Sequence, residues 1–391
     1  MALNYRHMSD RPRMHDRYRQ RIETILEGTG VALDGPHPWD IRVNDPRFFA
    51  RVLSQGTLGL GESYMDGWWD CAQLDEAITR LLRSDARAKL RPTPAVVFDA
   101  LAARLGNLQT PSRAFEVGEK HYDAGNDLYA AMLDRRMTYT CGYWKDVPAE
   151  RQGPAGLDEA QEAKLDLVCR KIGLKKGDRV LDIGCGWGSF AQFAAEKYGA
   201  SVVGLTISKE QAALARERCA GLPVEVRLQD YRDVNETFDH IVSLGMFEHV
   251  GHKNYRAYFE VVRRCLKDGG LFLLHTIGGL RSVRTTDPWI DRYIFPNSML
   301  PSAKQIAAAS EGLFVMEDWH NFSADYDKTL MAWHANVDAA WSRLQTYDER
   351  FRRMWRYYLL ACAGSFRSRK NQLWQIVFSK DGVPGGYASI R

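Results

Sequence analysis

The chain has 391 residues, of which 45% are hydrophobic and 26% are charged. These values are typical of a globular protein with one large domain and a smaller companion, and they exclude a disordered or low-complexity chain. The net charge of +4 is too small to name a partner, and no recognised nucleic-acid-binding module accompanies the basic residues. We therefore expect no nucleic acid among the partners.

Export and membrane-insertion signals are not found in the sequence. The first twenty residues carry five arginines and lack the apolar core of a signal peptide. No run of about eighteen apolar residues occurs, so we exclude a bilayer-spanning helix and expect any lipid contact to be peripheral. Seven cysteines without zinc spacing or a Cys-x-x-Cys pair favour reduced thiols in a cytoplasmic protein without a metal site.

Residues 1–104 are predicted to form a small helical domain. Asn44, Asp45 and Pro46 are typical of a helix start. The apolar face of that helix would consist of Phe48, Phe49, Val52 and Leu53. Two prolines in residues 91–94 break the helical pattern, so we expect the connection to a larger domain, residues 105–391, to follow them.

A glycine-rich segment in the larger domain joins a predicted strand to a predicted helix. Residues 179–183 have the β-branched, apolar composition of a buried parallel strand, and residues 189–198 carry apolar side chains at helical spacing. Gly184, Gly186 and Gly188 between them permit positive φ and close approach of the backbone to a ligand. Their spacing differs from the dinucleotide-binding pattern and resembles motif I of class I methyltransferases, which bind S-adenosylmethionine. A purely structural turn is the alternative.

Four more strands are predicted at residues 201–205, 224–228, 238–243 and 271–276. Helical segments separate several of them, and Ser208 could cap one of these helices. This alternation predicts an α/β fold, with a doubly wound Rossmann-like sheet of the methyltransferase type and right-handed crossovers. Ligand-facing residues should then lie just past the carboxyl end of each strand.

The second predicted strand departs from the usual methyltransferase plan. It commonly ends in an acidic residue that accepts hydrogen bonds from the cofactor ribose, but residues 201–208 contain no carboxylate. Thr206 or Gln211 would have to substitute with a hydroxyl or an amide. Asp230, after the third strand, is a candidate for the adenine amine, and a solvated loop aspartate is the alternative.

Seven further segments carry a more specific resemblance. They are residues 58–69, 121–127, 204–211, 245–251, 275–278, 318–322 and 324–327. Together with the glycine motif, they resemble the cyclopropane-fatty-acyl-phospholipid synthase family over nearly the whole chain. Residues 58–69 are similar to that family's N-terminal domain, which the related mycolate cyclopropane synthases lack.

The resemblance implies an enzyme that transfers the methyl group of S-adenosylmethionine to a cis double bond in an acyl chain of a membrane phospholipid. A carbocation would result, so water must be excluded while a base removes a proton and the cyclopropane ring closes. Aromatic faces can hold such a cation without attacking it. The alternatives are a methyltransferase that leaves a methyl or methylene branch, and a catalytically silent lipid-binding protein.

In the family, a bound bicarbonate is taken to be the proton acceptor. The residues that match its binding positions are Cys141, Glu248, His275, Ile277 through its backbone, and Tyr326. Glu248 would accept the bicarbonate hydroxyl proton, while the other polar groups would donate to its oxygens. From the residues alone, a lone His275 in an apolar strand is more often a satisfied core residue. Cys141 is interpreted as a neutral lining residue, and Cys362 is kept as a minor catalytic candidate.

The cofactor site implied by motif and resemblance draws on several loops. Its candidate residues are Tyr139, Thr140, Asp182, Gly184, Gly186, Gly188, Thr206, Ile207, Gln211, Gln229, Asp230 and Tyr231. Residues 120–129 resemble the family's lid, in which Tyr122 would close over the methionine end of the cofactor. Residues 278–303 are expected to be a lipid-covering insertion.

The C-terminal helices mix basic and aromatic residues. The basic ones are Arg343, Arg350, Arg352, Arg353, Arg356, Arg367, Arg369 and Lys370. They could face the anionic headgroups on the inner face of a membrane, or they could form the charged outer face of core-packing helices. Dimerisation through the N-terminal domain is a further expectation from the resemblance.

Overall fold

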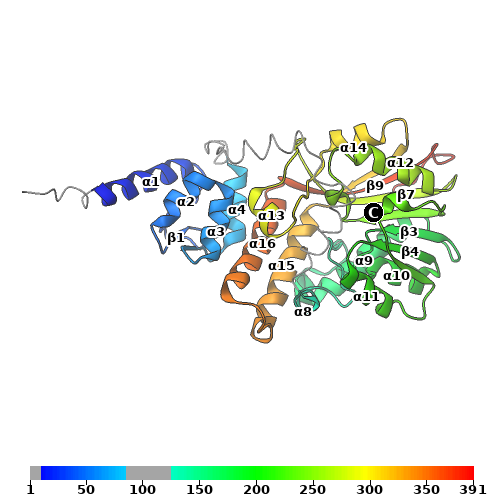
Figure 1. Ribbon diagram of the computed structural model, residues 1–391, viewed down its shortest axis with the longest axis horizontal. Coiled ribbons are helices and arrows are strands. Elements are labelled where there is room, and N and C mark those ends of the chain that lie inside the picture. Colours follow the sequence, from blue (N-terminus) through cyan, green and yellow to red (C-terminus); the bar gives the residue numbers. More distant parts are fainter. Residues whose placement is uncertain (1–9, 85–124) are drawn as a thin grey trace, which may run out of the picture. The chain divides into compact units, whose positions relative to one another are not determined.

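The computed structural model describes residues 10–84 and 125–391, which belong to two compact units (Figure 1). The described part of unit 1 comprises residues 10–84, 287–294 and 345–370. That of unit 2 comprises residues 125–286, 295–344 and 371–391. The predicted boundary at residue 104, the prolines of residues 91–94 and Tyr122 lie outside the described residues.

Unit 1 is mainly helical. Its elements are α1 (Asp10–Leu26), β1 (Arg42–Val43), α2 (Arg47–Gln55), α3 (Thr57–Met65), β2 (Trp69–Asp70), α4 (Leu74–Arg83), α13 (Pro288–Tyr293) and α16 (Glu349–Arg367). The predicted helix after Pro46 is α2, and it buries Phe48, Phe49 and Val52. An aromatic core forms where Trp69 and Tyr357 meet edge to face, with ring centroids 6.5 Å apart.

Helix α16 packs against α3 and α4 of unit 1, whereas the sequence analysis assigned it to the catalytic domain. Gly364 makes this packing close, because an added Cβ there would lie 2.5 Å from the carbonyl oxygen of Asp75. The helix is amphipathic, and its apolar face finds its partners among N-terminal residues far away in sequence. Residues 278–303 are likewise divided, since they contribute α13 to unit 1 and their remainder to unit 2.

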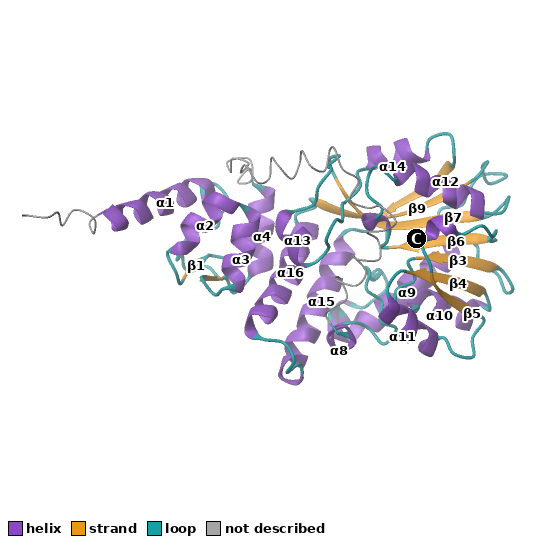
Figure 2. Cartoon of the chain, in the orientation of Figure 1, coloured by secondary structure: helices purple, strands orange, loops and turns teal. Residues whose placement is uncertain are grey.

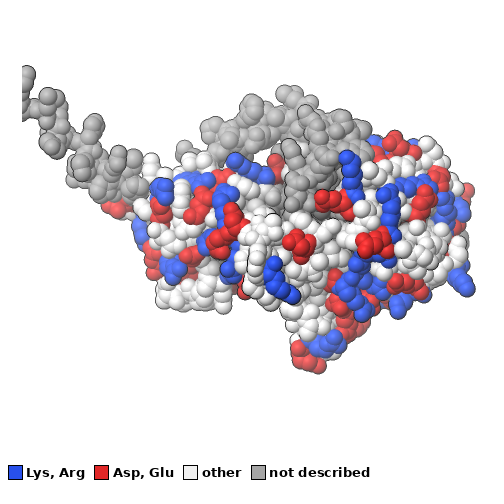
Figure 3. All heavy atoms as spheres, turned by 60° about the horizontal axis from the view of Figure 1, so that its bottom comes forward, with Lys and Arg blue, Asp and Glu red and all other residues white. Residues whose placement is uncertain are grey.

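Four of the five arginines of α16 are paired with carboxylates of unit 1. Three such ion pairs join Arg350 to Asp66 at 3.0 Å, Arg353 to Asp70 at 2.8 Å and Arg367 to Asp75 at 2.6 Å. Their charges are therefore used inside the unit, which favours the charged-face interpretation of these residues over a headgroup patch. On the face of the molecule drawn in Figure 3, basic and acidic side chains are interspersed.

Unit 2 contains an α/β sheet and its covering helices. Its strands are β3 (Arg179–Ile183), β4 (Ser201–Thr206), β5 (Val224–Leu228), β6 (His240–Leu244), β7 (Leu271–Gly279), β8 (Val315–Asn321) and β9 (Asn371–Ser379). Its helices are α8 (Asn126–Met132), α9 (Leu157–Lys171), α10 (Ser189–Tyr198), α11 (Lys209–Arg218), α12 (Tyr255–Cys265), α14 (Ala303–Ser310) and α15 (Ala324–Ala340). Short 3-10 helices are η1 (Ala149–Arg151), η2 (Pro154–Gly156), η3 (Tyr231–Asp233), η4 (Phe247–His249) and η5 (Trp341–Arg343).

The strand order in this sheet is β5-β4-β3-β6-β7-β9-β8. The five strands from β5 to β7 are parallel, and β9 lies antiparallel between β7 and β8. The predicted α/β fold is confirmed, and Ser208 caps α11 by accepting a hydrogen bond from the Gln211 amide. The carboxyl ends of β4, β3, β6 and β7 consequently lie side by side at one edge of the sheet.

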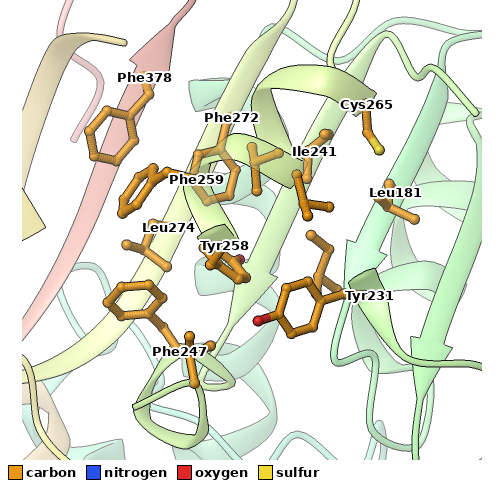
Figure 4. Close-up of a cluster of buried hydrophobic side chains, with 14 of the residues drawn as sticks. Leu181, Tyr231, Ile241, Phe247, Tyr258, Phe259, Cys265, Phe272, Leu274 and Phe378 are labelled. Carbon is orange, nitrogen blue, oxygen red and sulfur yellow. The ribbon is translucent and has the colours of Figure 1, made fainter. Parts of the chain in front are cut away.

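Helices cover both faces of the sheet, as Figure 2 shows. Successive strand residues point to opposite faces, so Leu181 joins one hydrophobic cluster and Val180 joins the other. The first cluster packs against α12 and α14 and is rich in aromatic rings (Figure 4). The second packs against α9 and α10. Across the described ranges, 10–84 and 125–391, no helix is both long and apolar enough to cross a membrane.

Candidate active site

The glycine motif forms the turn between β3 and α10. Gly184, Gly186 and Gly188 have φ angles of 86°, 54° and 81°, a region that side chains with a Cβ rarely adopt. The amides of Gly184 and Cys185 both donate to the Leu205 carbonyl of β4, at 3.0 and 2.8 Å. A Cβ added to Gly186 would meet no described atom within 4 Å. The backbone of this turn therefore requires glycine at these three positions, and there is open space beside the middle one, Gly186.

Asp182, next to this turn, is a buried carboxylate. Neither of its side-chain oxygens has a hydrogen-bond partner within the described part of the chain. Burial raises the pKa of Asp182 to about 7, and the positive charge of Lys164 opposes that rise. A buried acceptor of this kind needs a donor, and the ammonium group of an amino-acid ligand would satisfy it.

Lys164 is a further candidate site residue, which the sequence did not lead us to expect. Its ammonium group is fully buried on α9 and donates to Thr140 Oγ1 at 2.6 Å. Burial lowers the pKa of Lys164 to about 8, against the attraction of Asp134, Cys141 and Asp182. A signal was present in the sequence, because Lys164 falls in the apolar stripe of α9, between Gln161 and Val168.

The candidate ribose and adenine residues lie past β4 and β5. Thr206 Oγ1 donates to Gln211 Oε1 at 2.9 Å, so the two proposed substitutes for the missing carboxylate contact each other. The Gln229 amide donates to the Thr206 carbonyl at 3.1 Å, which brings the loop after β5 next to β4. Ile207, between Thr206 and the capping Ser208, is half-buried.

Asp230 and Tyr231 follow in the same loop. Asp230 is buried and accepts from the Arg232 amide at 2.9 Å and from its guanidinium at 2.7 Å, so it is not a solvated loop aspartate. The ring of Tyr231 packs in the first hydrophobic cluster, 5.2 Å from the Tyr258 ring (Figure 4). A cofactor contact by Tyr231 would therefore have to come from its backbone.

An aromatic cluster surrounds Tyr139. Its ring centroid lies 5.2 Å from that of Tyr129, 6.5 Å from Trp187, 6.5 Å from Phe295 and 5.3 Å from Trp333. Trp333 also meets Tyr326, with ring centroids 6.0 Å apart. These rings present π faces and few acceptor atoms, which suits a site that must hold positive charge without water.

Glu248 lies in η4, beyond the carboxyl end of β6. The Ile277 amide donates to Glu248 Oε1 at 2.6 Å, so this amide, which the sequence analysis assigned to an anion, is occupied by the carboxylate. Glu248 Oε2 is buried and has no partner among the described residues. Burial raises the pKa of Glu248 to about 7, although the Ile277 amide opposes the rise. One oxygen is fixed, and the other is left to accept a proton donor.

His275, on β7, is a buried and neutral imidazole. Burial lowers the pKa of His275 well below its usual value, and the charges of Lys164 and Lys171 lower it further. Nδ1 faces the amide nitrogen of Gln375 on β9 at 3.4 Å, while Nε2 has no partner within residues 10–84 and 125–391. His275 is thus not a satisfied core residue. With Gln375 donating to Nδ1, the ring proton lies on Nε2, which becomes a donor.

Cys141 and Tyr326 approach each other through Thr329 on α15. The Thr329 hydroxyl lies 3.9 Å from Cys141 Sγ, and Tyr326 precedes Thr329 by one helical turn. Burial keeps the pKa of the Cys141 thiol well above its usual value, so the thiol is neutral. His275 reaches the same region through Phe322, which precedes α15, with ring centroids 5.9 Å apart.

Cys362 is the one candidate that does not belong to unit 2. It is on α16 in unit 1, and burial raises the pKa of its thiol to about 12. A thiol that stays protonated at neutral pH is a poor nucleophile. The other candidates all belong to unit 2.

Comparison with known proteins shows which family the chain is similar to. A family model described as mycolic acid cyclopropane synthetase matches residues 109–376. The cyclopropane-fatty-acyl-phospholipid synthase of Escherichia coli K12 is 55% identical over 96% of this chain and 97% of its own. A probable fatty acid methyltransferase of Pseudomonas putida is 40% identical over 68% of this chain and 69% of its own. The crystal structure of a mycolic acid cyclopropane synthase complexed with SAH and CTAB is 34% identical and superposes with a TM-score of 0.62, covering 68% of this chain and 98% of that one.

Proposed function

The chain belongs to the mycolic acid cyclopropane synthetase family, and from that premise we propose that it is an S-adenosylmethionine-dependent cyclopropane-fatty-acyl-phospholipid synthase. It moves a methyl group onto a cis double bond of a phospholipid acyl chain, and the ring closes with loss of one methyl proton. The observation that carries this proposal is the 55% identity to the Escherichia coli synthase over nearly both whole chains. The intact set of Glu248, His275 and Tyr326 supports it against a silent lipid-binding protein.

The residues at the carboxyl edge of the sheet fit the cofactor. Bound S-adenosylmethionine supplies an electrophilic methyl group on a sulfonium centre. The unpartnered carboxylate of Asp182 suits the cofactor's ammonium group, and the open space at Gly186 lets the backbone approach. Lys164 holds the Thr140 hydroxyl in place beside them. The remaining candidates past β4 and β5 are proposed to hold the ribose and the adenine.

Glu248 and His275 fit a small anion that can both donate and accept. Bound bicarbonate, which is part of this proposal, supplies a base for the methyl proton. Glu248 Oε2 would accept its hydroxyl proton, and His275 Nε2 would donate to one of its oxygens, so that these two unpartnered atoms would both gain a partner. Cys141, Tyr326 and the Ile277 region are proposed to complete the pocket. The aromatic cluster around Tyr139 excludes water and stabilises the cationic stage.

We further propose that the predicted domains, residues 1–104 and 105–391, act as an N-terminal and a catalytic domain, with α13 and α16 counted with the N-terminal one. The rest of residues 278–303 would cover the lipid. The protein would work at the inner face of the membrane as a homodimer through its N-terminal domain. A dimer would give twice the monomer mass of 44.6 kDa in light scattering, and a monomeric mass would contradict this part.

Product analysis tests the proposal. The protein is incubated with methyl-labelled S-adenosylmethionine and unsaturated phospholipid vesicles, and the modified acyl chain is identified by mass spectrometry. Label in a cyclopropane carbon is expected. Label in a methyl or methylene branch would favour the second candidate, which the 40% identity to a probable fatty acid methyltransferase supports. Absence of any lipid product would reject the substrate class.

A further inference from the structure

The segment that follows β7 is exposed over six consecutive residues, 280–285. Leu280 is 65% exposed, which is the highest value among the exposed large hydrophobic residues of the described chain, and Val283 is 41% exposed. The strand before the segment carries His275 and Ile277. The exposed apolar side chains therefore begin three residues beyond the backbone amide that holds Glu248.

The same segment carries basic residues without acidic partners. Arg281 and Arg284 form no ion pair within the described part of the chain. This contrasts with the paired arginines of α16. Burial lowers the pKa of His252, and Arg284 and Lys253 lower it further, so positive charges gather beside this segment.

The backbone of the segment is held in place. The Gly279 amide donates to the Pro301 carbonyl at 2.8 Å, the hydroxyls of Ser282 and Ser302 lie 2.8 Å apart, and the Gln305 side chain donates to the Val283 carbonyl at 3.2 Å. Ser302 and Gln305 also form the capping box of α14. The apolar and basic side chains are thus displayed from a fixed backbone, which reduces the entropy lost on binding.

We infer that residues 280–285, the docking segment, bind the surface of an anionic phospholipid bilayer. Leu280 and Val283 enter the boundary between headgroups and acyl chains, and Arg281 and Arg284 contact the phosphates. This inference rests on the proposed function, because an acyl chain buried in a bilayer can reach the site only if the protein binds that bilayer. The alternation of exposed apolar and unpaired basic residues favours a lipid surface over a protein partner, whose binding site would be less charged at its centre.

A matched pair of variants tests the inference. Val283→Asp changes the docking segment, and Val315→Asp changes a valine of nearly equal exposure, 41% against 42%. Val315 pairs with Ser379, whereas Gly279 pairs with Asn371, so Val315 lies at the opposite end of the sheet. Binding of the full chain is measured by sedimentation with vesicles of saturated phosphatidylcholine, with and without phosphatidylglycerol. Saturated lipids cannot be methylated, so binding is measured apart from turnover.

Val283→Asp is expected to weaken binding to the anionic vesicles by about tenfold or more, while Val315→Asp stays within about twofold of the wild type. The double variant Arg281→Gln/Arg284→Gln is expected to lose about 25-fold, at about fivefold for each arginine, and most of the salt dependence of binding. Unchanged SAH affinity and melting temperature would show that the variants are folded. Equal losses for the two valine variants, or a wild type that does not bind vesicles, would overturn the inference.

Failure of the docking surface and failure of the proposed function give different results. If the wild type binds saturated vesicles through the docking segment but yields no methylated product from unsaturated ones, the proposed function fails and the docking surface stands. If product forms on vesicles at the same rate with Val283→Asp as with the wild type, the docking surface fails and the proposed function stands.

Discussion

Glu62 in unit 1 and Glu248 in unit 2 are both buried glutamates. They differ in how many hydrogen-bond and ion-pair partners their carboxylates have. Glu62 is bonded by the guanidinium of Arg51, by Arg292 at 3.1 Å and by the Tyr293 hydroxyl at 2.8 Å. Glu248 accepts a hydrogen bond from the Ile277 amide, but its buried Oε2 has no partner among the described residues and no cation pairs with it there. A fully bonded buried carboxylate stabilises its unit, whereas a partly bonded one costs stability and is retained for a ligand. A structural glutamate and a ligand-binding glutamate are therefore distinguished by whether their oxygens have hydrogen-bond partners, and not by whether they are buried.

The largest expected effect is on turnover, and it distinguishes two single variants that carry the same substitution, Glu248→Gln and Glu62→Gln. Glu248→Gln keeps shape but removes the acceptor charge, so we expect turnover to fall by about 100-fold or more with SAH affinity retained. Glu62→Gln should leave turnover per folded molecule near normal and lower the free energy of unfolding by about 2 kcal/mol. Labelled methyl transfer and urea denaturation measure the two effects. Near-normal turnover in Glu248→Gln would refute its role.

Removal of bicarbonate tests what satisfies the unpartnered atoms of Glu248 and His275. Dialysis of the wild type into bicarbonate-free buffer under inert gas should slow turnover at least about tenfold, because the site then lacks its base. Added bicarbonate should restore the rate, with an equal amount of chloride as the control. If bicarbonate restores nothing, the base is a side chain, and His275 is the first candidate.

Lys164 and Lys171, two buried lysines of α9, allow the same kind of comparison between a candidate site residue and a structural one. Lys164→Met removes the donor to Thr140 and the charge that lowers the pKa of Asp182, so SAH affinity should fall by about tenfold. Lys171 is equally buried but lies 3.0 Å from His320 Nδ1, and Lys171→Met is the matched control with little change in affinity. Isothermal titration calorimetry with SAH measures both. Equal affinity losses in the two variants would argue against a specific role of Lys164.

The smallest effect is expected at Cys362. Its thiol lies on α16 in unit 1 with a pKa raised to about 12 by burial, so Cys362→Ala should keep turnover within about twofold of the wild type. A tenfold loss in the methyl-transfer assay, without loss of stability, would restore Cys362 as a catalytic candidate.

The sequence predicts the local parts of this fold well. Strands β3 and β5 and helix α10 have the predicted bounds, because glycines and hydrophobic periodicity mark their ends. The position of α16 could not be predicted in the same way. Its amphipathic pattern requires a partner surface, but α4 and α3 lie nearly 300 positions earlier in the chain and nothing local identifies them. The antiparallel strand β9 between β7 and β8 is likewise a long-range pairing.

In the candidate site, too, the identity of some residues could be predicted from the sequence, but their long-range contacts could not. Glu248 and His275 were identified through the family resemblance, but the sequence does not reveal which of their atoms lack partners. That property depends on contacts from distant strands, such as Ile277 to Glu248 and Gln375 to His275. Lys164 could have been found, since a lysine within an apolar helical stripe is costly unless its charge is used. Gln375 carries no comparable signal within the apolar strand β9.

The interleaving of the two units has a consequence for how this protein is made. Unit 1 takes α16 from residues 349–367, so a growing chain that has left the ribosome only as far as residue 104 cannot complete it. Gly364, Arg353 and Arg367 reach their partners on α4 and β2 only after almost the whole of unit 2 has been synthesised. The first segment made is therefore among the last to be finished, and an N-terminal fragment lacks the helix that closes its own core.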